Sequence, residues 1–282
     1  MGDSYLLRAL NSALGVVLAV SAQVGAAAPS DPGPAPERRA RPVAGRDISW
    51  PNCPKGLGIP SRRTQGKPMP PPGVPFVVLG LTNGPAFHPN PCLTEQVGFA
   101  RALRAWASAY AVVTYPTRQQ LQVYGAAGPR RHTHRAGRLW NTGWAQARQN
   151  VAAMREVGLD SPAVWIDVEP VSPPSPWSDN RRANRTVFEG ALAYYRSAGL
   201  RVGVYSTQRM WRDIMGPVRY RLPEWRTAGM TSRRAALRMC STHRYQGGRP
   251  LLTQWYTPDI DLNLVCPRAS GVLARYFTRL TG

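Results

Sequence analysis

The chain has 282 residues, and its 36 basic and 15 acidic side chains give a formal net charge of +21. Hydrophobic residues make up 43% of it and include nine Trp and eleven Tyr, which excludes a wholly disordered chain. Four cysteines are too few for a disulfide scaffold, and no collagen-like glycine period is present. The composition therefore predicts a globular protein with a sizeable core.

The positive charge is almost entirely arginine. Only Lys55 and Lys67 are lysines, and the other 34 basic residues are arginine. They are spread along the chain, whereas a nucleic-acid-binding protein more often gathers its basic residues in one stripe or tail. We therefore expect a general attraction to polyanions and no specific nucleic-acid partner.

The amino terminus resembles a secretory signal over residues 1–28. Arg8 supplies positive charge, residues 9–22 are mostly apolar, and residues 25–28 are small, as at a cleavage site. The apolar stretch is short for a membrane span, although an uncleaved anchor is the alternative. Residues 29–45 form a Pro-rich linker, and residues 46–282 form one domain. We expect a secreted or cell-wall protein with no membrane span after signal removal.

The cysteines favour two disulfides, because an even count in an exported chain is typical of a disulfide framework. They are Cys53, Cys92, Cys240 and Cys266. Three pairings are open, and we prefer Cys53–Cys92 with Cys240–Cys266 because each closes one long loop. No CxxC motif or Cys/His spacing suggests zinc, so we expect neither a metal nor a cofactor.

Short apolar runs alternate with helical patterns, which predicts an α/β fold. Expected strands lie at residues 46–50, 76–81, 110–115, 163–169, 201–206, 223–228, 251–256 and 260–265. Expected helices start at Thr94, Thr142 and Asn180 and end near Ala109, Gly158 and Gly199. Residues 51–75, 117–140 and 226–250 are expected to be insertions.

Eight strands with helices between them predict a closed, TIM-type (β/α) barrel in a single domain, modified by the insertions. The alternative is an open doubly wound sheet. Its dinucleotide-binding form loses support because no GxGxxG motif follows the first strand.

Acidic residues are scarce, and several lie within or at the ends of apolar strands, where an unused carboxylate is costly. Asp167 and Glu169 are two residues apart, so they share one face at the carboxyl end of a strand. Two carboxyl groups in one cleft repel, which raises the proton affinity of at least one. A carboxylic acid that stays protonated near neutral pH is what a glycosidic leaving group requires.

The ordered motifs resemble glycoside hydrolase family 25, the lysozyme-like N-acetylmuramidases, and related exported glycoside-hydrolase-like proteins. They are Asp47-Ile48-Ser49 on the first strand, Asp167-Val168-Glu169 in mid-domain, Tyr205-Ser206-Thr207 with Trp211, Gln254-Trp255, and Asp261-Leu262-Asn263 near the end. The match covers roughly residues 45–266.

The resemblance implies a barrel with missing or reversed strands that cleaves the β-1,4 bond between N-acetylmuramic acid and N-acetylglucosamine in peptidoglycan. It makes Glu169 the general acid and has Asp167 tune it and assist the substrate's acetamido group. Asp47 and Asp261 would stabilise positive charge or position water. Attack by the acetamido group and direct attack by water both stay open.

Aromatic and amide side chains beside these acids are candidates for substrate binding, because aromatic rings stack on sugar rings. They are Trp50, Tyr115, Tyr205, Gln254 and Trp255, while Trp165 is assigned to the core. The expected partner is peptidoglycan or another cell-wall polysaccharide, and the expected state is a monomer. The alternative function is a non-catalytic wall-glycan-binding protein that keeps the barrel but has lost turnover.

Overall fold

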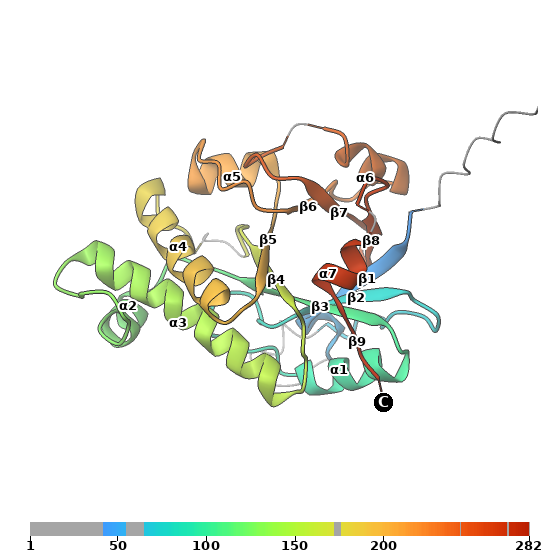
Figure 1. Cartoon of the computed structure of the whole chain (residues 1–282), viewed down its shortest axis with the longest axis horizontal. Coiled ribbons are helices and arrows are strands. Elements are labelled where there is room, and N and C mark those ends of the chain that lie inside the picture. Colours follow the sequence, from blue (N-terminus) through green and yellow to red (C-terminus); the bar gives the residue numbers. More distant parts are fainter. Residues whose placement is uncertain (1–41, 55–64, 172–175, 243, 270, 282) are drawn as a thin grey trace, which may run out of the picture. The chain divides into compact units, whose positions relative to one another are not determined.

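The computed structural model describes residues 42–54, 65–171, 176–242, 244–269 and 271–281. In this part eight strands form a closed ring, in which each strand pairs with the next and the eighth returns to the first (Figure 1). The predicted barrel is therefore confirmed. The expected signal segment, and all of the expected linker before Pro42, lie outside the described residues.

The strands follow one another around the barrel in sequence order. They are β1 (Ala44–Ile48), β2 (Phe76–Gly80), β3 (Trp106–Val112), β4 (Ala163–Asp167), β5 (Arg201–Ser206), β6 (Glu224–Thr227), β7 (Pro250–Tyr256) and β8 (Asp261–Val265). Strands β1 to β7 are parallel, whereas β8 runs antiparallel to both β7 and β1. A reversed strand of this kind agrees with the modified barrel that the resemblance implied.

The reversal brings the start of β8 to the same end of the barrel as the carboxyl ends of the parallel strands. Tyr256, the last residue of β7, pairs with Asp261, the first residue of β8. A short strand, β9 (Thr278–Arg279), pairs antiparallel with the start of β3, at the opposite end.

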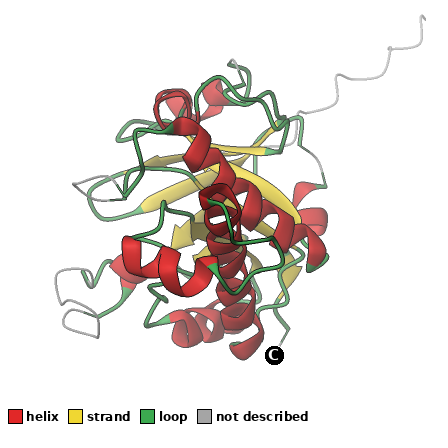
Figure 2. Cartoon of the chain, turned by 90° about the vertical axis from the view of Figure 1, so that its left-hand side faces the viewer, coloured by secondary structure: helices red, strands yellow, loops and turns green. Residues whose placement is uncertain are grey.

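Helices cover the outside of the barrel. They are α1 (Leu93–Ala102), α2 (Arg118–Gly125), α3 (Arg135–Glu156), α4 (Arg181–Ser197), α5 (Gln208–Met215), α6 (Arg233–Met239) and α7 (Val272–Tyr276). A 3-10 turn, Trp50–Asn52, follows β1. Figure 2 shows the helices around the strands. None of the described helices is long and apolar enough to cross a membrane.

Two of the expected helix boundaries are wrong. The first helix ends at Ala102 and not at Ala109, because Arg104 has a φ of 50° and the chain turns into β3 at Trp106. The long helix α3 begins at Arg135, so Thr142 is not its cap but donates its hydroxyl to the carbonyl of Arg138 within the helix. Asn180 caps α4 as expected, accepting from the backbone N–H of Ala183.

Helices α3 and α4 lie side by side (Figure 1) and approach each other through two glycines. A Cβ atom on Gly143 would lie 1.9 Å from the carbonyl oxygen of Val187, and one on Gly190 would lie 2.0 Å from that of Trp140. Only glycine permits this backbone contact, so it fixes where the two helices cross.

Large aromatic side chains fill the barrel interior. Phe76, Trp165, Trp225 and Phe277 belong to one buried cluster and are at most 2% exposed. Gly203 makes room for Trp165, because a Cβ at that position would lie 2.2 Å from the indole ring. Trp165 belongs to the core, as the sequence indicated, and it supports the side chains above it at the carboxyl end.

Candidate active site

The four candidate acids come together in one cavity of about 310 Å³. Asp47 comes from β1, Asp167 ends β4, Glu169 follows it, and Asp261 begins β8. The carboxyl ends of the parallel strands and the start of the reversed strand thus supply all four. The other lining residues are Ile48, Ser49, Trp50, Pro51, Lys67, Tyr110, Tyr205, Trp225, Gln254 and Tyr256.

Asp47 is held by two amide side chains from the end of the chain. Gln254 Nε2 donates to both of its carboxylate oxygens at 3.0 and 3.1 Å, and Asn263 Nδ2 donates to Oδ1 at 2.5 Å. Each amide is oriented in turn, because Gln254 Oε1 accepts from the Tyr205 hydroxyl at 2.8 Å and Asn263 Oδ1 accepts from Trp225 Nε1 at 2.8 Å. Asp47 is therefore fixed in position by a network that ends in two aromatic rings.

Burial raises the pKa of Asp47 to about 7, and the nearby charge of Asp261 adds to the rise. The hydrogen bonds from Gln254 and Asn263 and the charge of Arg46 oppose it. The group is thus poised to change its charge near neutral pH.

Asp167 and Glu169 form a carboxyl pair joined by a hydrogen bond in which Asp167 is the proton donor. Burial, together with the charge of Glu169, raises the pKa of Asp167 well above its usual range. Burial also raises the pKa of Glu169 to about 7, with a smaller rise from Asp261 and an opposing effect of the hydrogen bond from Asp167. Near neutral pH the pair therefore retains at least one proton.

Asp261 differs from the other three acids because the charge of Lys67 acts on it. Burial raises its pKa, whereas Lys67 and Arg46 lower it. Arg46 Nε donates to the backbone carbonyl of Asp261 at 2.8 Å, which holds the guanidinium beside the start of β8. No sequence signal marked Lys67 or Arg46 as parts of the site.

The aromatic candidates divide between the cavity and other places. Trp50 and Tyr205 line the cavity, whereas Trp255 does not. Trp255 alternates with Gln254 along β7, so its ring faces outward and packs with Ala236 and Leu264. The structure thus places Trp255 outside this cavity, and a role for it in substrate binding stays a prediction.

Tyr115 also lies outside the acidic cavity. It lines a separate hollow of about 490 Å³ with Arg118, Arg135 and Arg138, and its hydroxyl accepts from Arg135 at 2.8 Å. Tyr115 is the third residue after the end of β3, so its ring lies beyond the strand and away from the acids.

Trp225, like Tyr110 and Tyr256, is an aromatic residue of the cavity that was not among the candidates. Its strand, β6, has only four residues, and their sequence, Glu-Trp-Arg-Thr, is not an apolar run that would have marked it. The Trp225 ring contacts Tyr205 edge-on at 4.7 Å between centroids and forms part of the cavity wall.

Two disulfides occur in the described domain, one at the turn after β1 and one that joins the end of α6 to the end of β8. Cys53 is bonded to Cys92, and Cys240 is bonded to Cys266, which are the two pairings that the sequence favoured. Within the described residues, no group of three or more His, Cys, Asp or Glu side chains is arranged to hold a metal ion.

A third and larger hollow of about 860 Å³ includes Pro170, the residue that follows Glu169 in the chain. Trp177 lines it and donates its indole N–H to the backbone carbonyl of Glu169 at 3.0 Å. Trp177 therefore contacts the backbone of the candidate acid from the side of this hollow, although the two cavities share no lining residue.

Sequence comparison finds lysozyme-like relatives. A family model described as lysozyme-like protein 1 matches residues 135–225. A probable GH family 25 lysozyme 4 of Dictyostelium discoideum is 40% identical over 53 residues, or 19% of this chain and 23% of that protein. Lysozyme-like protein 5 of Caenorhabditis elegans is 27% identical over 71 residues, or 25% of this chain. The matches span only about a quarter to a third of these curated relatives.

Solved structures with the same fold cover nearly the whole described domain. The bacterial lysozyme of Streptomyces coelicolor matches 84% of this chain and 98% of its own, with a TM-score of 0.54 and 17% identity. The GH25 lysozyme of Aspergillus fumigatus matches 86% of this chain and 100% of its own, with a TM-score of 0.54 and 14% identity. In fold and in local sequence, this chain resembles the lysozymes of glycoside hydrolase family 25, as its ordered motifs indicated.

Proposed function

We propose that the protein is an exported glycoside hydrolase that cleaves the β-1,4 bond of peptidoglycan glycan strands, with Glu169 as the general acid. The observation that carries the proposal is the Asp167–Glu169 carboxyl pair, which lines an accessible cavity and retains a proton near neutral pH. The hydrogen bond keeps this proton chiefly on Asp167. We propose that it moves within the pair to Glu169 and passes from there to the glycosidic oxygen as the bond breaks.

Asp167 would act on Glu169 and on the substrate. It is 2% exposed, and its Oδ1 atom has no hydrogen-bond partner among the described residues. That oxygen is available to accept from a substrate N–H, such as the acetamido group of an N-acetyl sugar. An acceptor there would orient the acetamide for attack at the anomeric carbon, which is a recognised alternative to a second enzymic nucleophile.

Asp47 and Asp261 supply negative charge from the other side of the cavity, on β1 and β8. The reaction develops positive charge on the sugar ring, so an ionised carboxylate there stabilises the transition state more than the ground state. The same groups can position water. Trp50 and Tyr205 offer ring faces for a sugar, and Gln254 acts by holding Asp47.

The neighbouring hollow supports a polymeric substrate. A cavity of about 310 Å³ is at the small end of the range for ligand pockets. The hollow that Trp177 lines adds room for sugars on one side of the reacting bond. The names of the relatives, which are lysozymes and muramidases, favour peptidoglycan as that polymer.

The test is the release of reducing sugar from purified peptidoglycan. Glu169→Gln keeps the shape of the side chain but removes the transferable proton, and we expect it to lower the rate by about 10²–10⁴-fold. Asp167→Asn should also lower it. Glu156→Gln, which changes an exposed carboxylate at the end of α3 away from both hollows, is the matched control and should leave the rate unchanged.

Failure of the wild-type protein to release reducing sugar from any wall preparation would exclude the enzyme. Retention on peptidoglycan without cleavage would then support the non-catalytic glycan-binding protein. Circular dichroism of each variant separates loss of chemistry from loss of fold.

A further inference from the structure

Lys67 is the only lysine among the described residues, and it lies in the acidic cavity. The other basic side chains of the described domain are arginines, and most are spread over its surface. Lys67 belongs to the Pro-rich insertion between β1 and β2, where no functional group was expected. Lys67 thus places one ammonium group in a cavity that contains four carboxyl groups.

The backbone around Lys67 is fixed against the turn that follows β1. The N–H of Lys67 donates to the carbonyl of Pro51 at 2.9 Å, and the N–H of Gly66 donates to that of Cys53 at 2.7 Å. Asn52 Nδ2 donates to the carbonyl of Pro68 at 3.0 Å. The disulfide of Cys53 ties the turn to the start of α1. The lysine is thus presented to the cavity by a braced loop.

The charged groups around Asp261 come from several elements. Strand β1 contributes Arg46 and Asp47, the end of β4 contributes Glu169 with Asp167 behind it, and the braced loop contributes Lys67. Tyr256 faces Asp261 across the β7–β8 pair, and the nearby Asp259 is exposed. Arg46 already binds the backbone carbonyl of Asp261. Lys67 and Arg46 both offset the Asp261 carboxylate, with Lys67 the larger contributor, and of the two only Lys67 lines the cavity.

We infer that Lys67 is a positioning residue whose ammonium group keeps Asp261 ionised while the Asp167–Glu169 pair keeps its proton. The catalytic part of this inference rests on the proposed function. Four carboxyl groups in one cavity cannot all ionise readily near neutral pH, because each ionised group disfavours ionisation of the next. The positive charge of Lys67 favours the ionised form of Asp261 and leaves the proton on the Asp167–Glu169 pair.

This division is what a glycosidase needs. The general acid must hold its proton, and the carboxylate that faces the developing positive charge must not. The structure gives no direct ion pair between Lys67 and Asp261, so the ammonium acts across the cavity. Charges in a partly closed cavity still interact strongly, because less water screens them.

The direct test is the titration of Asp261, followed by carboxyl ¹³C NMR, and it needs no enzymatic activity. In Lys67→Met the Asp261 midpoint should rise by about one pH unit, because the favourable charge is lost. Lys67→Arg should restore the wild-type midpoint. Arg196→Met removes one positive charge from an exposed site near the end of α4 and should not move it. An Asp261 midpoint that is the same in wild type and Lys67→Met overturns the inference.

The second readout is the pH dependence of kcat/KM on peptidoglycan. In Lys67→Met the acidic limb should move to higher pH by a similar amount, and Lys67→Arg should reverse the change. A purely structural role for Lys67 would lower activity at every pH without moving the limb, which would also overturn the inference. If wild type is inactive but Asp261 still shifts, the proposed function fails and the assignment of Lys67 stands.

Discussion

At the scale of single residues, the cavity concentrates acids whose proton affinities are raised by burial. Asp47 and Glu169 both have a pKa near 7, although one is held by two amides and the other by a carboxylic acid. Because these carboxyl groups bind protons more tightly in the folded state than in the unfolded state, they couple the stability of the fold to pH.

The direction of this coupling predicts how the melting temperature changes with pH. A carboxyl group with a raised folded-state pKa contributes stability that is complete below its unfolded pKa, near 4, and is lost as pH rises through about 7. We therefore expect the melting temperature to fall as pH is raised from 5 to 8. Asp47→Asn cannot ionise and should flatten the decline, as measured by thermal melts. A melting temperature that rises over this range in wild type would contradict the prediction.

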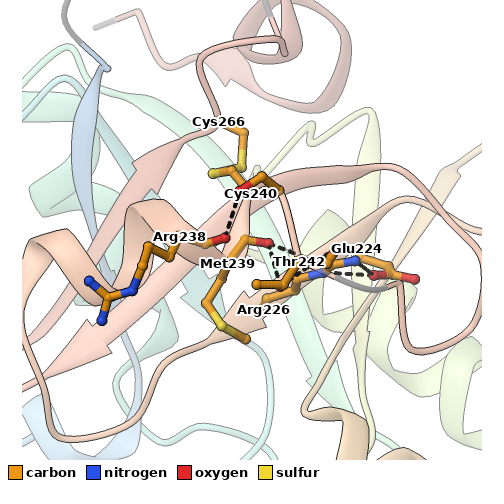
Figure 3. The surroundings of a disulfide bond; sticks show 8 residues. Glu224, Arg226, Arg238, Met239, Cys240, Thr242 and Cys266 are labelled. Atoms are coloured by element: carbon orange, nitrogen blue, oxygen red, sulfur yellow. Dashed lines mark hydrogen bonds and ion pairs between the residues drawn. A yellow bond between two sulfur atoms is a disulfide. The ribbon is translucent and has the colours of Figure 1, made fainter.

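At the scale of elements, a buried ion pair fastens the loop after α6 to the barrel. Arg226 on β6 is 1% exposed and forms a salt bridge with Glu224 at 2.5 Å. Arg226 also donates to the backbone carbonyls of Met239, at 2.6 Å, and Thr242. Figure 3 shows this cluster beside the Cys240–Cys266 disulfide. The disulfide and the arginine thus secure the same segment.

Removing one partner of the Arg226–Glu224 ion pair should lower the stability of the fold. Arg226→Met leaves Glu224 as a buried charge without its cation, and we expect a loss of about 3–5 kcal/mol in the free energy of unfolding. Urea denaturation measures it. The double variant Glu224→Gln with Arg226→Met should lose less than the single one, because no uncompensated charge remains. Equal losses in the two variants would show that the carbonyl contacts, and not the charge, carry the stabilisation.

The elements also show what the sequence could predict. The expected strands overlap all eight barrel strands, although β3 begins at Trp106 and not at Tyr110, and strand parity placed Asp167 and Glu169 on one face, because both features depend on local periodicity. The outward position of Trp255 was not predicted, because both faces of a barrel strand are buried and burial alone does not distinguish inside from outside.

Other parts of the site depend on contacts that no local pattern records. Lys67 reaches the cavity only because its loop folds back on the turn after β1. Asn263 was visible in the Asp261-Leu262-Asn263 motif and shares the parity of Asp261, but its partner Asp47 is far away in sequence. Such residues could be assigned only after the ring of strands was closed.

At the scale of the whole molecule, the net charge of +21 is not balanced by surface ion pairs. Only two salt bridges occur among the described residues, and one of them is the buried pair. Most arginines therefore keep their charge available to an anionic surface such as a cell wall.

The excess of positive charge predicts that retention of the protein on cell walls depends on the salt concentration. Binding of the protein to intact walls should weaken markedly between about 50 and 500 mM NaCl, because the Debye length falls several-fold and the attraction is screened. Pull-down of Glu169→Gln protein with purified walls measures binding without cleavage. Cleavage of a soluble, uncharged oligosaccharide should respond much less to salt. Retention that is independent of salt would show that the glycan cleft, and not charge, holds the protein to the wall.

The reversed strand β8 determines when the acid cluster assembles during folding. Asp47 lies near the start of the domain, but its partners Gln254 and Asn263 follow 207 and 216 residues later. Contacts of such long sequence separation form only when most of the chain is in place. A chain that is still emerging from the ribosome therefore has no assembled acid cluster. Any activity that depends on this cluster begins only after the last barrel strand has docked.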